Sequence, residues 1–255
     1  MRTPGLFPRL CLAAAALLLF QAPFVRAASV PQNASPANLE LSSLPPEERG
    51  DLFMARKEYF AAIDAYRQAP TDAETLNKMG IAFHHLSAID QARKDYQKAL
   101  LIRPNYPEAL NNLGAADFAQ RDYKRAIRLY RKALQLMPQS AVIAANLGTA
   151  YFARGNYKSG LEAYQTAFRL DPDVFDSDAP SVISGPSGVR DRAREDFCIA
   201  ELFAQAGNQD SALFYLRRAL NNGFSDRNRL LQDTDFAQLR KTPQFAQLMA
   251  EEKIH

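Results

Sequence analysis

Two adjacent histidines are the first residues of this sequence whose type suggests chemistry, because imidazole binds metals and transfers protons near neutral pH. His84 and His85 lie in a stretch with helical periodicity, so their side chains point about 100° apart around the helix axis. Neither has a carboxylate, histidine or cysteine three or four residues away, the spacing that a helical metal pair needs. We interpret both as exposed or groove-lining side chains and predict no metal site.

Other acidic and nucleophilic groups do not have the spacing of a known kind of site. The acidic cluster of Asp171, Asp173, Asp176 and Asp178 lacks the central glycine and the terminal glutamate of a calcium loop. Cys198 is the only cysteine after residue 27, which predicts a semi-buried structural thiol; a cross-link between two chains is the alternative. The sequence contains no glycine-rich phosphate loop, nucleophile elbow or Cys-x-x-Cys motif. It therefore predicts a protein that is not an enzyme and needs no cofactor.

The charge balance argues against a nucleic-acid partner. Residues 1–27 contain Arg2, Arg9 and Arg26 and no acidic residue. Without them, 28 of the 31 basic residues remain against 28 acidic residues, so the formal net charge is zero. Affinity for nucleic acid depends on a surplus of positive charge on one surface, which this chain lacks. We predict no binding to DNA or RNA.

Two asparagines suggest a different chemistry, hydrogen bonding to a peptide backbone. Asn112 and Asn146 are 34 residues apart, and each is followed by Leu-Gly. A carboxamide both donates and accepts, so a row of such side chains can pair with the main chain of an extended peptide whatever its side chains are. A row of this kind forms only if the elements that carry the two asparagines repeat at the same interval.

The sequence does repeat at that interval. Three tracts, residues 73–106, 107–140 and 141–174, superimpose with matching residue types. The coinciding positions are Gly80, Gly114 and Gly148; Tyr96, Tyr130 and Tyr164; Ala99, Ala133 and Ala167; and Pro104, Pro138 and Pro172. A fixed period in this range is typical of stacked supersecondary units.

The residue types within each tract predict two helices. Apolar residues recur at intervals of three and four, the spacing of one helical face. The glycines place the smallest side chains where two helices approach closely, since the distance between helix axes follows the size of the contacting side chains. The prolines lack the N–H that a continuing helix needs, so each ends one unit and starts the next. Between the two helices, Arg121-Asp122 and Gly155-Asn156 provide a left-handed residue followed by an N-cap.

These motifs resemble the tetratricopeptide repeat family. The C-terminal sequences Asn222-Gly223-Phe224, Asp233-Thr234-Asp235-Phe236 and Thr242-Pro243-Gln244-Phe245 resemble the ending of exported bacterial members of the family. The resemblance implies an all-α fold, a right-handed α-solenoid of helix-turn-helix repeats with C-terminal capping helices at residues 225–255. A fourth repeat, residues 193–224, follows an inserted loop at residues 175–192, and residues 43–72 match as a degenerate N-terminal capping repeat. We interpret residues 175–192 as either a cover over the groove or a disordered connection.

The family resemblance also implies where a partner binds. In such proteins the first helix of each repeat lines a concave groove, which here assigns these residues to a peptide-binding groove: Asn77, Lys78, Ile81, His84, Asn111, Asn112, Phe118, Asn146, Thr149 and Phe152. Two alternatives stay open at this point. The asparagines are common at this place in such repeats and can simply face water, and the two phenylalanines can be buried packing.

The N-terminal segment predicts export. Arg2 and Arg9 precede an apolar run from Leu10 to Phe20, and small residues flank a cleavage point after Ala27, so residues 1–27 read as a secretory signal peptide. Residues 28–46, rich in Pro, Ser, Asn and Gln, predict a flexible leader. We therefore expect a periplasmic or secreted protein. An uncleaved signal that anchors the chain in the inner membrane is the alternative, and it would be the only membrane contact.

Taken together, the sequence predicts an interaction protein of the cell envelope. The first hypothesis is a non-catalytic scaffold or adaptor whose groove binds an extended or helical segment of another protein. The second is a structural subunit of an envelope complex, or a homo-oligomer, which uses its convex face or its C-terminal helices. Replacing Asn112 and Asn146 with alanine separates the two, because only the first hypothesis predicts a loss of partner binding.

Overall fold

The computed structural model describes residues 43–175 and 189–251 of the 255-residue chain. These residues belong to one compact unit that spans residues 41–255. The signal peptide predicted at residues 1–27 and the leader up to residue 42 lie outside the described residues, as do residues 176–188 of the predicted inserted loop.

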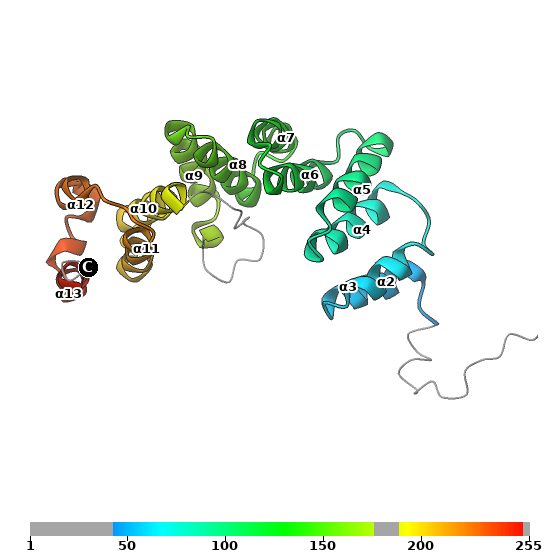
Figure 1. Cartoon of the computed structure of the whole chain (residues 1–255), viewed down its shortest axis with the longest axis horizontal. Helices are drawn as coiled ribbons and strands as arrows, with labels where there is room; N and C mark the ends of the chain where they lie inside the picture. The colour runs from blue at the N-terminus through cyan, green and yellow to red at the C-terminus, as the bar shows by residue number, and fades with distance from the viewer. Residues whose placement is uncertain (1–42, 176–188, 252–255) are drawn as a thin grey trace, which may run out of the picture. The chain divides into compact units, whose positions relative to one another are not determined.

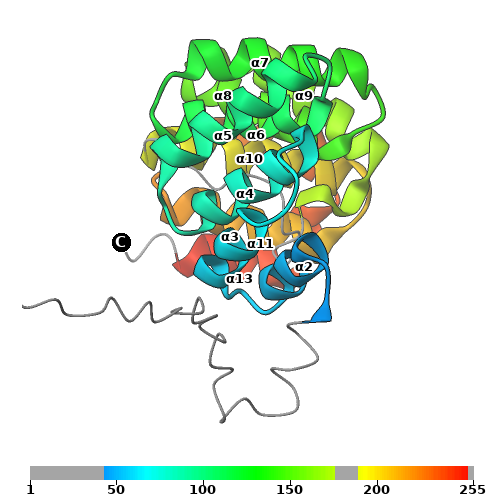
Figure 2. The same cartoon turned by 90° about the vertical axis from the view of Figure 1, so that its right-hand side faces the viewer.

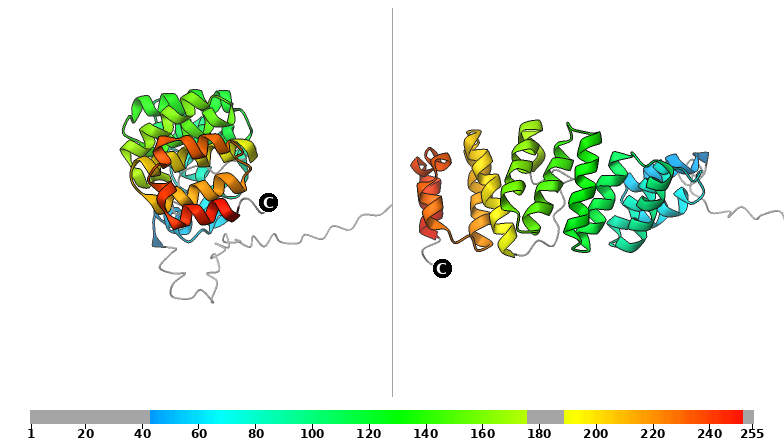
Figure 3. Two further views of the ribbon diagram at one scale, coloured as in Figure 1. Left: turned by 90° about the vertical axis from the view of Figure 1, so that its left-hand side faces the viewer. Right: turned by 90° about the horizontal axis from the view of Figure 1, so that it is seen from above.

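The described residues form helices and no strand, so the predicted all-α fold is confirmed. The helices come in pairs: α2 (Pro46–Ala55) and α3 (Tyr59–Tyr66), α4 (Ala73–His85) and α5 (Ile89–Ile102), α6 (Pro107–Ala119) and α7 (Tyr123–Leu136), α8 (Ala141–Ala153) and α9 (Tyr157–Leu170), α10 (Val189–Gln205) and α11 (Gln209–Asn221). The two helices of a pair pack on each other, and each pair from α2–α3 to α8–α9 packs on the next. Within this unit the pairs follow one another in chain order (Figures 1 and 3), and Figure 2 shows them one behind another.

Two element boundaries differ from the sequence prediction or refine it. The helix α10 begins at Val189, inside the loop predicted at residues 175–192, because the helix-breaking Gly and Pro residues end at Gly188. The other end of that loop adjoins a 3₁₀ turn, η1 (Pro172–Phe175), whose Phe175 is buried. In the first repeat, α3 ends at Tyr66, four residues before Pro70.

In the four pairs from α2–α3 to α8–α9, a glycine on the first helix contacts a tyrosine on the second. The contact occurs at Gly50–Tyr66, Gly80–Tyr96, Gly114–Tyr130 and Gly148–Tyr164. At Gly114 an added Cβ would lie 2.7 Å from Cε1 of Tyr130, closer than carbon atoms approach, so the ring occupies the space that a side chain would need. The pair α10–α11 has Ala200 and Leu216 at the equivalent positions, both fully buried. In this pair the residue on the first helix is larger than glycine, and the residue on the second helix is smaller than tyrosine.

The residue that closes the first helix of each pair has left-handed backbone geometry. The φ angles are 60° at Lys57, 58° at Ser87, 63° at Arg121, 79° at Gly155 and 79° at Gly207. A side chain in this region costs about 1–2 kcal/mol, a cost that glycine avoids. The repeat thus requires the conformation in every unit, while the sequence provides glycine in only some of them.

We expect Gly155→Ala to lower the free energy of unfolding by about 1 kcal/mol. No atom lies within 4 Å of a Cβ added at Gly155, so the loss reports the backbone cost without a steric clash. Arg121→Gly is the matched control, because it should stabilise the protein by up to about 1 kcal/mol. Urea denaturation followed by circular dichroism measures both changes. Equal stability of Gly155→Ala and the parent would contradict this account of the turn.

The residue after the left-handed position caps the second helix in three of the pairs. The side chains of Asp122, Asn156 and Asn208 accept hydrogen bonds from the backbone N–H groups three residues ahead, at 3.0, 3.3 and 3.1 Å. Each bond satisfies one of the donors that a helix start leaves without a partner. The predicted turn chemistry at Arg121-Asp122 and Gly155-Asn156 is confirmed.

Asp117 on α6 is buried where the other repeats carry Phe83, Tyr151 and Phe203. Its carboxylate forms ion pairs with Nε of Arg93 on α5 at 3.0 Å and with Nε of Arg125 on α7 at 2.9 Å. Burial raises the pKa of Asp117, and Arg125 and Arg93 oppose that rise. The polar residue therefore links three helices of two neighbouring repeats.

The last pair of helices is covered by short C-terminal elements. These are α12 (Arg227–Gln232), the 3₁₀ turns η2 (Thr234–Phe236) and η3 (Leu239–Lys241), and α13 (Pro243–Glu251). They bury Leu230, Phe236, Leu239, Phe245 and Leu248 in the same cluster as the apolar residues of α10 and α11. The end of a solenoid exposes an apolar face unless something covers it. The predicted capping helices fulfil this role.

Across the described part of the chain, every helix is too short or too polar to span a bilayer.

Candidate peptide-binding groove

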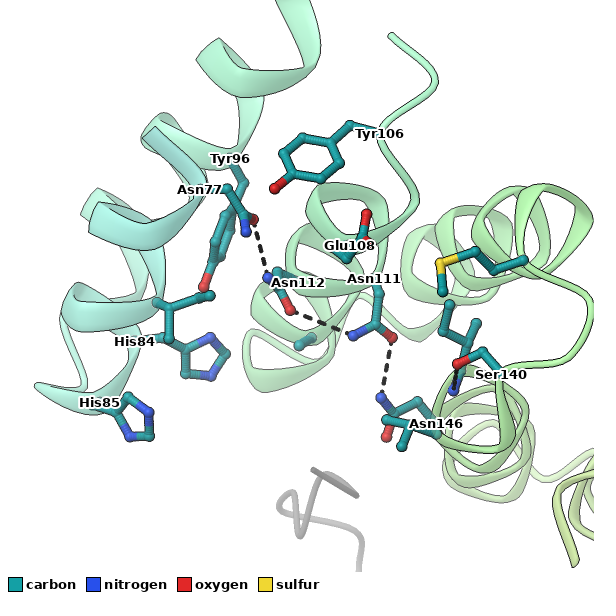
Figure 4. Close-up of a pocket in the computed structure, with 15 residues that line it drawn as sticks. Asn77, His84, His85, Tyr96, Tyr106, Glu108, Asn111, Asn112, Ser140 and Asn146 are labelled. Carbon is teal, nitrogen blue, oxygen red and sulfur yellow. Dashed lines mark hydrogen bonds between the residues drawn. The ribbon is translucent and has the colours of Figure 1, made fainter. Parts of the chain in front are cut away.

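A groove of about 580 Å³ runs across the first helices of three neighbouring repeats, α4, α6 and α8. Most of its lining is polar but uncharged, or apolar. The lining residues are Asn77, Ile81, His84, His85, Tyr96, Tyr106, Glu108, Asn111, Asn112, Ala115, Met137, Ser140, Val142, Ile143 and Asn146. Figure 4 shows the four asparagines close together along the groove, with His84 and His85 toward one end of it and Tyr106 and Glu108 at one side.

The four asparagines form a continuous chain of hydrogen bonds across the three helices. Nδ2 of Asn146 on α8 donates to Oδ1 of Asn111 at 3.1 Å, and Nδ2 of Asn112 donates to Oδ1 of Asn77 on α4 at 3.0 Å. Within α6, Nδ2 of Asn111 donates to Oδ1 of Asn112 at 3.4 Å. Figure 4 draws this chain. The carboxamides therefore orient one another, which fixes a polar strip along the groove.

The electrostatic character of the groove is close to neutral. Glu108 is the only Asp, Glu, Lys or Arg in the lining. The pKa of His84 is lowered, first by burial and then by the neighbouring His85, so its imidazole is neutral at pH 7. The ring of His85 stacks on Tyr59 of α3 with centroids 4.7 Å apart. This groove offers hydrogen bonds and apolar contacts with little net charge.

The structure brings six of the ten predicted groove residues together in this lining: Asn77, Ile81, His84, Asn111, Asn112 and Asn146. Lys78 lies elsewhere, and its predicted place in the groove needs correction. Its ammonium group pairs with Glu47 at 2.8 Å and Asp51 at 2.9 Å on α2, and with Glu74 at 3.4 Å. Two acids four residues apart on the first repeat hold this lysine, so it links that repeat to the second.

Phe118, Thr149 and Phe152 are also corrected: all three are buried and, unlike the equally buried Asn77 and Asn146, none of them lines the groove. Phe118 and Phe152 are 1% and 0% exposed and pack on Tyr123 and Tyr157, which resolves the open alternative in favour of packing. Thr149 is 3% exposed, and its hydroxyl donates to or accepts from the hydroxyl of Tyr164 at 2.9 Å. In α6 and α8 these positions thus face the second helix of the same repeat, whereas His84, at the equivalent position of α4, lines the groove. Phe152 also lines a second pocket, which is separate from the groove.

Other lining residues were not assigned to the groove from the sequence. Tyr106 and Ser140 come directly before first helices, Glu108 and Val142 lie in their first turns, and Met137 follows a second helix. They reach the groove because its edge is formed where one repeat passes to the next. One feature of the sequence could have identified them: each lies close to the repeat boundary at Pro104 or Pro138.

Glu201 on α10 is the titrating group with the clearest consequence for stability. It is buried, Nη2 of Arg229 approaches one of its oxygens to 2.6 Å, and its pKa is raised to about 7, chiefly by burial and then by its hydrogen bond with Asp233. A raised pKa means that the folded state favours the protonated acid. The stability that this acid contributes is therefore complete below its ordinary pKa of about 4.5 and is lost as pH rises through about 7.

We therefore expect the melting temperature to decrease as the pH rises from 5 to 8. In Glu201→Gln the melting temperature should depend less on pH over this range. Circular dichroism melts across the pH range measure it. Glu162→Gln, at an exposed acid on α9, is the matched control and should keep the parent profile. A pH profile of Glu201→Gln as steep as that of the parent would show that another group titrates.

Comparison with protein-family models agrees with this architecture. Family models described as tetratricopeptide repeat match residues 71–139 and 117–179. No curated protein matches the sequence. Among solved structures, a crystal structure of MamA is 22% identical and covers 70% of this chain and 96% of its own, with a TM-score of 0.47. MamA from Desulfovibrio magneticus RS-1 is 20% identical over 74% of this chain and 96% of its own, with a TM-score of 0.49.

The structure of the APC/C hetero-tetramer Cut9–Hcn1 contains a chain with the same kind of fold. It is 19% identical, with a TM-score of 0.52, and the match covers 81% of this chain but only 35% of that one. At this level of identity the similarity concerns the fold alone. The matched repeats, the paired helices and the repeated glycine–tyrosine contacts lead to one conclusion: the chain is a tetratricopeptide repeat protein, a class of scaffold for protein–protein interaction.

Proposed function

We propose that this protein is a non-catalytic scaffold whose groove on α4, α6 and α8 binds an extended segment of a partner protein through its main chain. The observation that carries the proposal is the asparagine chain across three repeats. A carboxamide has two N–H donors and two acceptor lone pairs. The hydrogen bonds among the asparagines use one donor and one acceptor each of Asn111 and Asn112, and both side chains are half-buried in the groove lining.

The remaining donors and acceptors suit a peptide backbone, which alternates N–H and C=O groups along an extended chain. The mutual hydrogen bonds hold the carboxamides in place, so little conformational entropy is lost when a peptide binds. Apolar lining from Ile81, Met137 and Val142 adds contacts with the side chains of the segment. The groove should therefore favour neutral segments and tolerate varied sequences.

Site-specific photocrosslinking identifies such a segment. A photoreactive residue at His84, inside the groove, should capture a partner peptide that the same residue at Arg131, on the exposed face of α7, does not capture. The captured segment is then synthesised with and without methyl groups on its backbone nitrogens. Main-chain recognition requires that N-methylation abolish binding, so an unchanged affinity of the methylated peptide would reject the mechanism.

We expect Asn112→Ala to weaken binding of that segment by about tenfold, because it removes one carboxamide from the middle of the strip. The variant should lose only about 1–2 kcal/mol of stability, from the lost hydrogen bonds with Asn77 and Asn111. Fluorescence anisotropy measures the affinity, and a melting curve confirms folding. Arg131→Ala is the control and should bind as the parent does. An Asn112→Ala variant with parental affinity would place the partner elsewhere.

A second candidate, a structural subunit or a homo-oligomer, has its own supporting observation. Large apolar side chains are exposed on second helices, including Phe60 at 74%, Leu101 at 82% and Phe214 at 50%. Such side chains suit lateral contact with another protein surface. Light scattering after size exclusion separates this candidate from the first: an oligomer that Phe214→Ser dissociates, and that groove variants leave intact, would favour it.

We also propose export to the cell envelope, on the strength of Arg2, Arg9 and the apolar run from Leu10 to Phe20. Expression of the full chain followed by mass spectrometry of the periplasmic fraction tests it. The expected product begins at Ala28. A membrane-bound product of full length would instead support an uncleaved anchor, and a full-length product in the cytoplasm would reject export.

A further inference from the structure

A second pocket, of about 800 Å³, lies toward the C-terminal end of the repeats and is independent of the asparagine groove. It is formed by α8, α9, α10, α12 and the turn that precedes α12. Aromatic rings make up much of its wall: Phe152, Tyr157, Phe197 and Phe224. The rings of Phe197 and Phe224 stack with centroids 4.0 Å apart, so the wall is packed in advance of any ligand.

Two arginines lie against these rings. The guanidinium carbon of Arg194 is 4.3 Å from the ring centroid of Tyr157, and that of Arg229 is 4.9 Å from the centroid of Phe197. Glu201 at 2.6 Å and Asp233 at 3.9 Å hold Arg229 in place. Among the described residues, no carboxylate lies within ion-pair distance of Arg194, so this guanidinium keeps its charge available.

Asp226, the acidic residue in the lining, already accepts a hydrogen bond. Asp226 caps α12, where its carboxylate accepts a hydrogen bond from the backbone N–H of Arg229 at 3.0 Å. The lining of the pocket thus contains two guanidinium groups and one carboxylate, and that carboxylate serves as the N-cap of α12. A guanidinium that lies over an aromatic ring can still donate its N–H groups to a carboxylate. The charge of this pocket differs from that of the groove, whose only Asp, Glu, Lys or Arg is the acid Glu108.

We propose that this pocket is a second binding site, which takes an acidic peptide segment with an aromatic residue beside an Asp or Glu. The carboxylate meets the N–H edge of Arg194, and the aromatic side chain packs against Phe197 and Phe224. The aromatic wall favours a ring over a small side chain, since aromatic pairs add to the gain from apolar burial. The proposal does not depend on the function of the asparagine groove.

Fluorescence anisotropy with three labelled peptides tests the site in the full chain. The peptides alternate Glu with Phe, Gln with Phe, or Lys with Phe. The Glu–Phe peptide should bind at least about tenfold more tightly than the Gln–Phe peptide, and the Lys–Phe peptide should not bind. Arg194→Ala should remove that preference, whereas Arg131→Ala, on the exposed face of α7, should preserve it. Melting curves establish that each variant is folded.

Four results would overturn the proposal. The first is equal binding of the Glu–Phe and Gln–Phe peptides, and the second is full retention of the preference by a folded Arg194→Ala variant. The third is binding of single-stranded DNA or of vesicles with anionic lipid in place of the peptide, lost in Arg194→Ala, which would identify a phosphate site. Asn112→Ala keeps the binding of the Glu–Phe peptide on this account, so loss of binding in that variant would place the peptide in the other groove.

Discussion

Gly114→Ala is expected to destabilise the protein by about 2 kcal/mol. The new methyl group would meet the ring of Tyr130 at 2.7 Å, and that ring is fully buried, so it cannot move aside without disturbing its neighbours. Urea denaturation measures the loss. Ala115→Gly on the same helix is the reverse exchange and should cost about 1 kcal/mol, so helix propensity by itself would make Gly114→Ala stabilising and cannot explain a loss.

The α10–α11 pair predicts how the loss can be repaired. There, Ala200 and Leu216 occupy the places of Gly114 and Tyr130, and both are fully buried. We therefore expect Gly114→Ala combined with Tyr130→Leu to recover at least about 1 kcal/mol relative to the sum of the single changes. Among the described residues, the hydroxyl of Tyr130 has no hydrogen-bond partner, so Tyr130→Leu removes no bond there. Strict additivity of the two substitutions would show that the ring and the glycine do not compete for one space.

Phe236→Ala is expected to cost about 3–5 kcal/mol, the largest effect of any single substitution considered. Phe236 lies in η2, is fully buried and meets the ring of Phe197 edge-on with centroids 5.5 Å apart. Its loss opens the cover over α10 and α11, so thermal unfolding should begin in that region. Leu231→Ala, at a neighbouring leucine that is 49% exposed, should change stability by less than about 0.5 kcal/mol. If Phe236→Ala changed the stability as little as Leu231→Ala, the C-terminal elements would not be a cap.

The repeat period made the architecture predictable, because periodic glycines, tyrosines and prolines each have a local physical cause. The period also located Asn112 and Asn146 at equivalent places. It did not reveal that the hydrogen bonds join Asn112 to Asn77 and Asn146 to Asn111, each 35 residues apart. That offset follows from how neighbouring helices stagger, which depends on packing between repeats and is not encoded in any single repeat.

The corrected positions have physical reasons of the same kind. Lys78 shares the register of Asn112, but an electrostatic attraction to Glu47 and Asp51 on the preceding repeat holds its side chain. Phe118 and Phe152 share a position that faces the second helix, where burial of an aromatic ring outweighs exposure to the groove. Composition and spacing could not rank these competing contacts. The second pocket was hidden for a related reason, since α12 joins it from outside the repeat pattern.

The helix α8 contributes to both sites, with Asn146 in the groove and Phe152 in the second pocket, about 9 Å apart along the helix axis. A partner that carried a neutral stretch and an acidic stretch on one chain could occupy both sites at once. Its second contact would then form at a high effective concentration, so two weak affinities would combine into strong avidity without any change of shape. Discrimination among partners would rest on the length of chain between the two stretches.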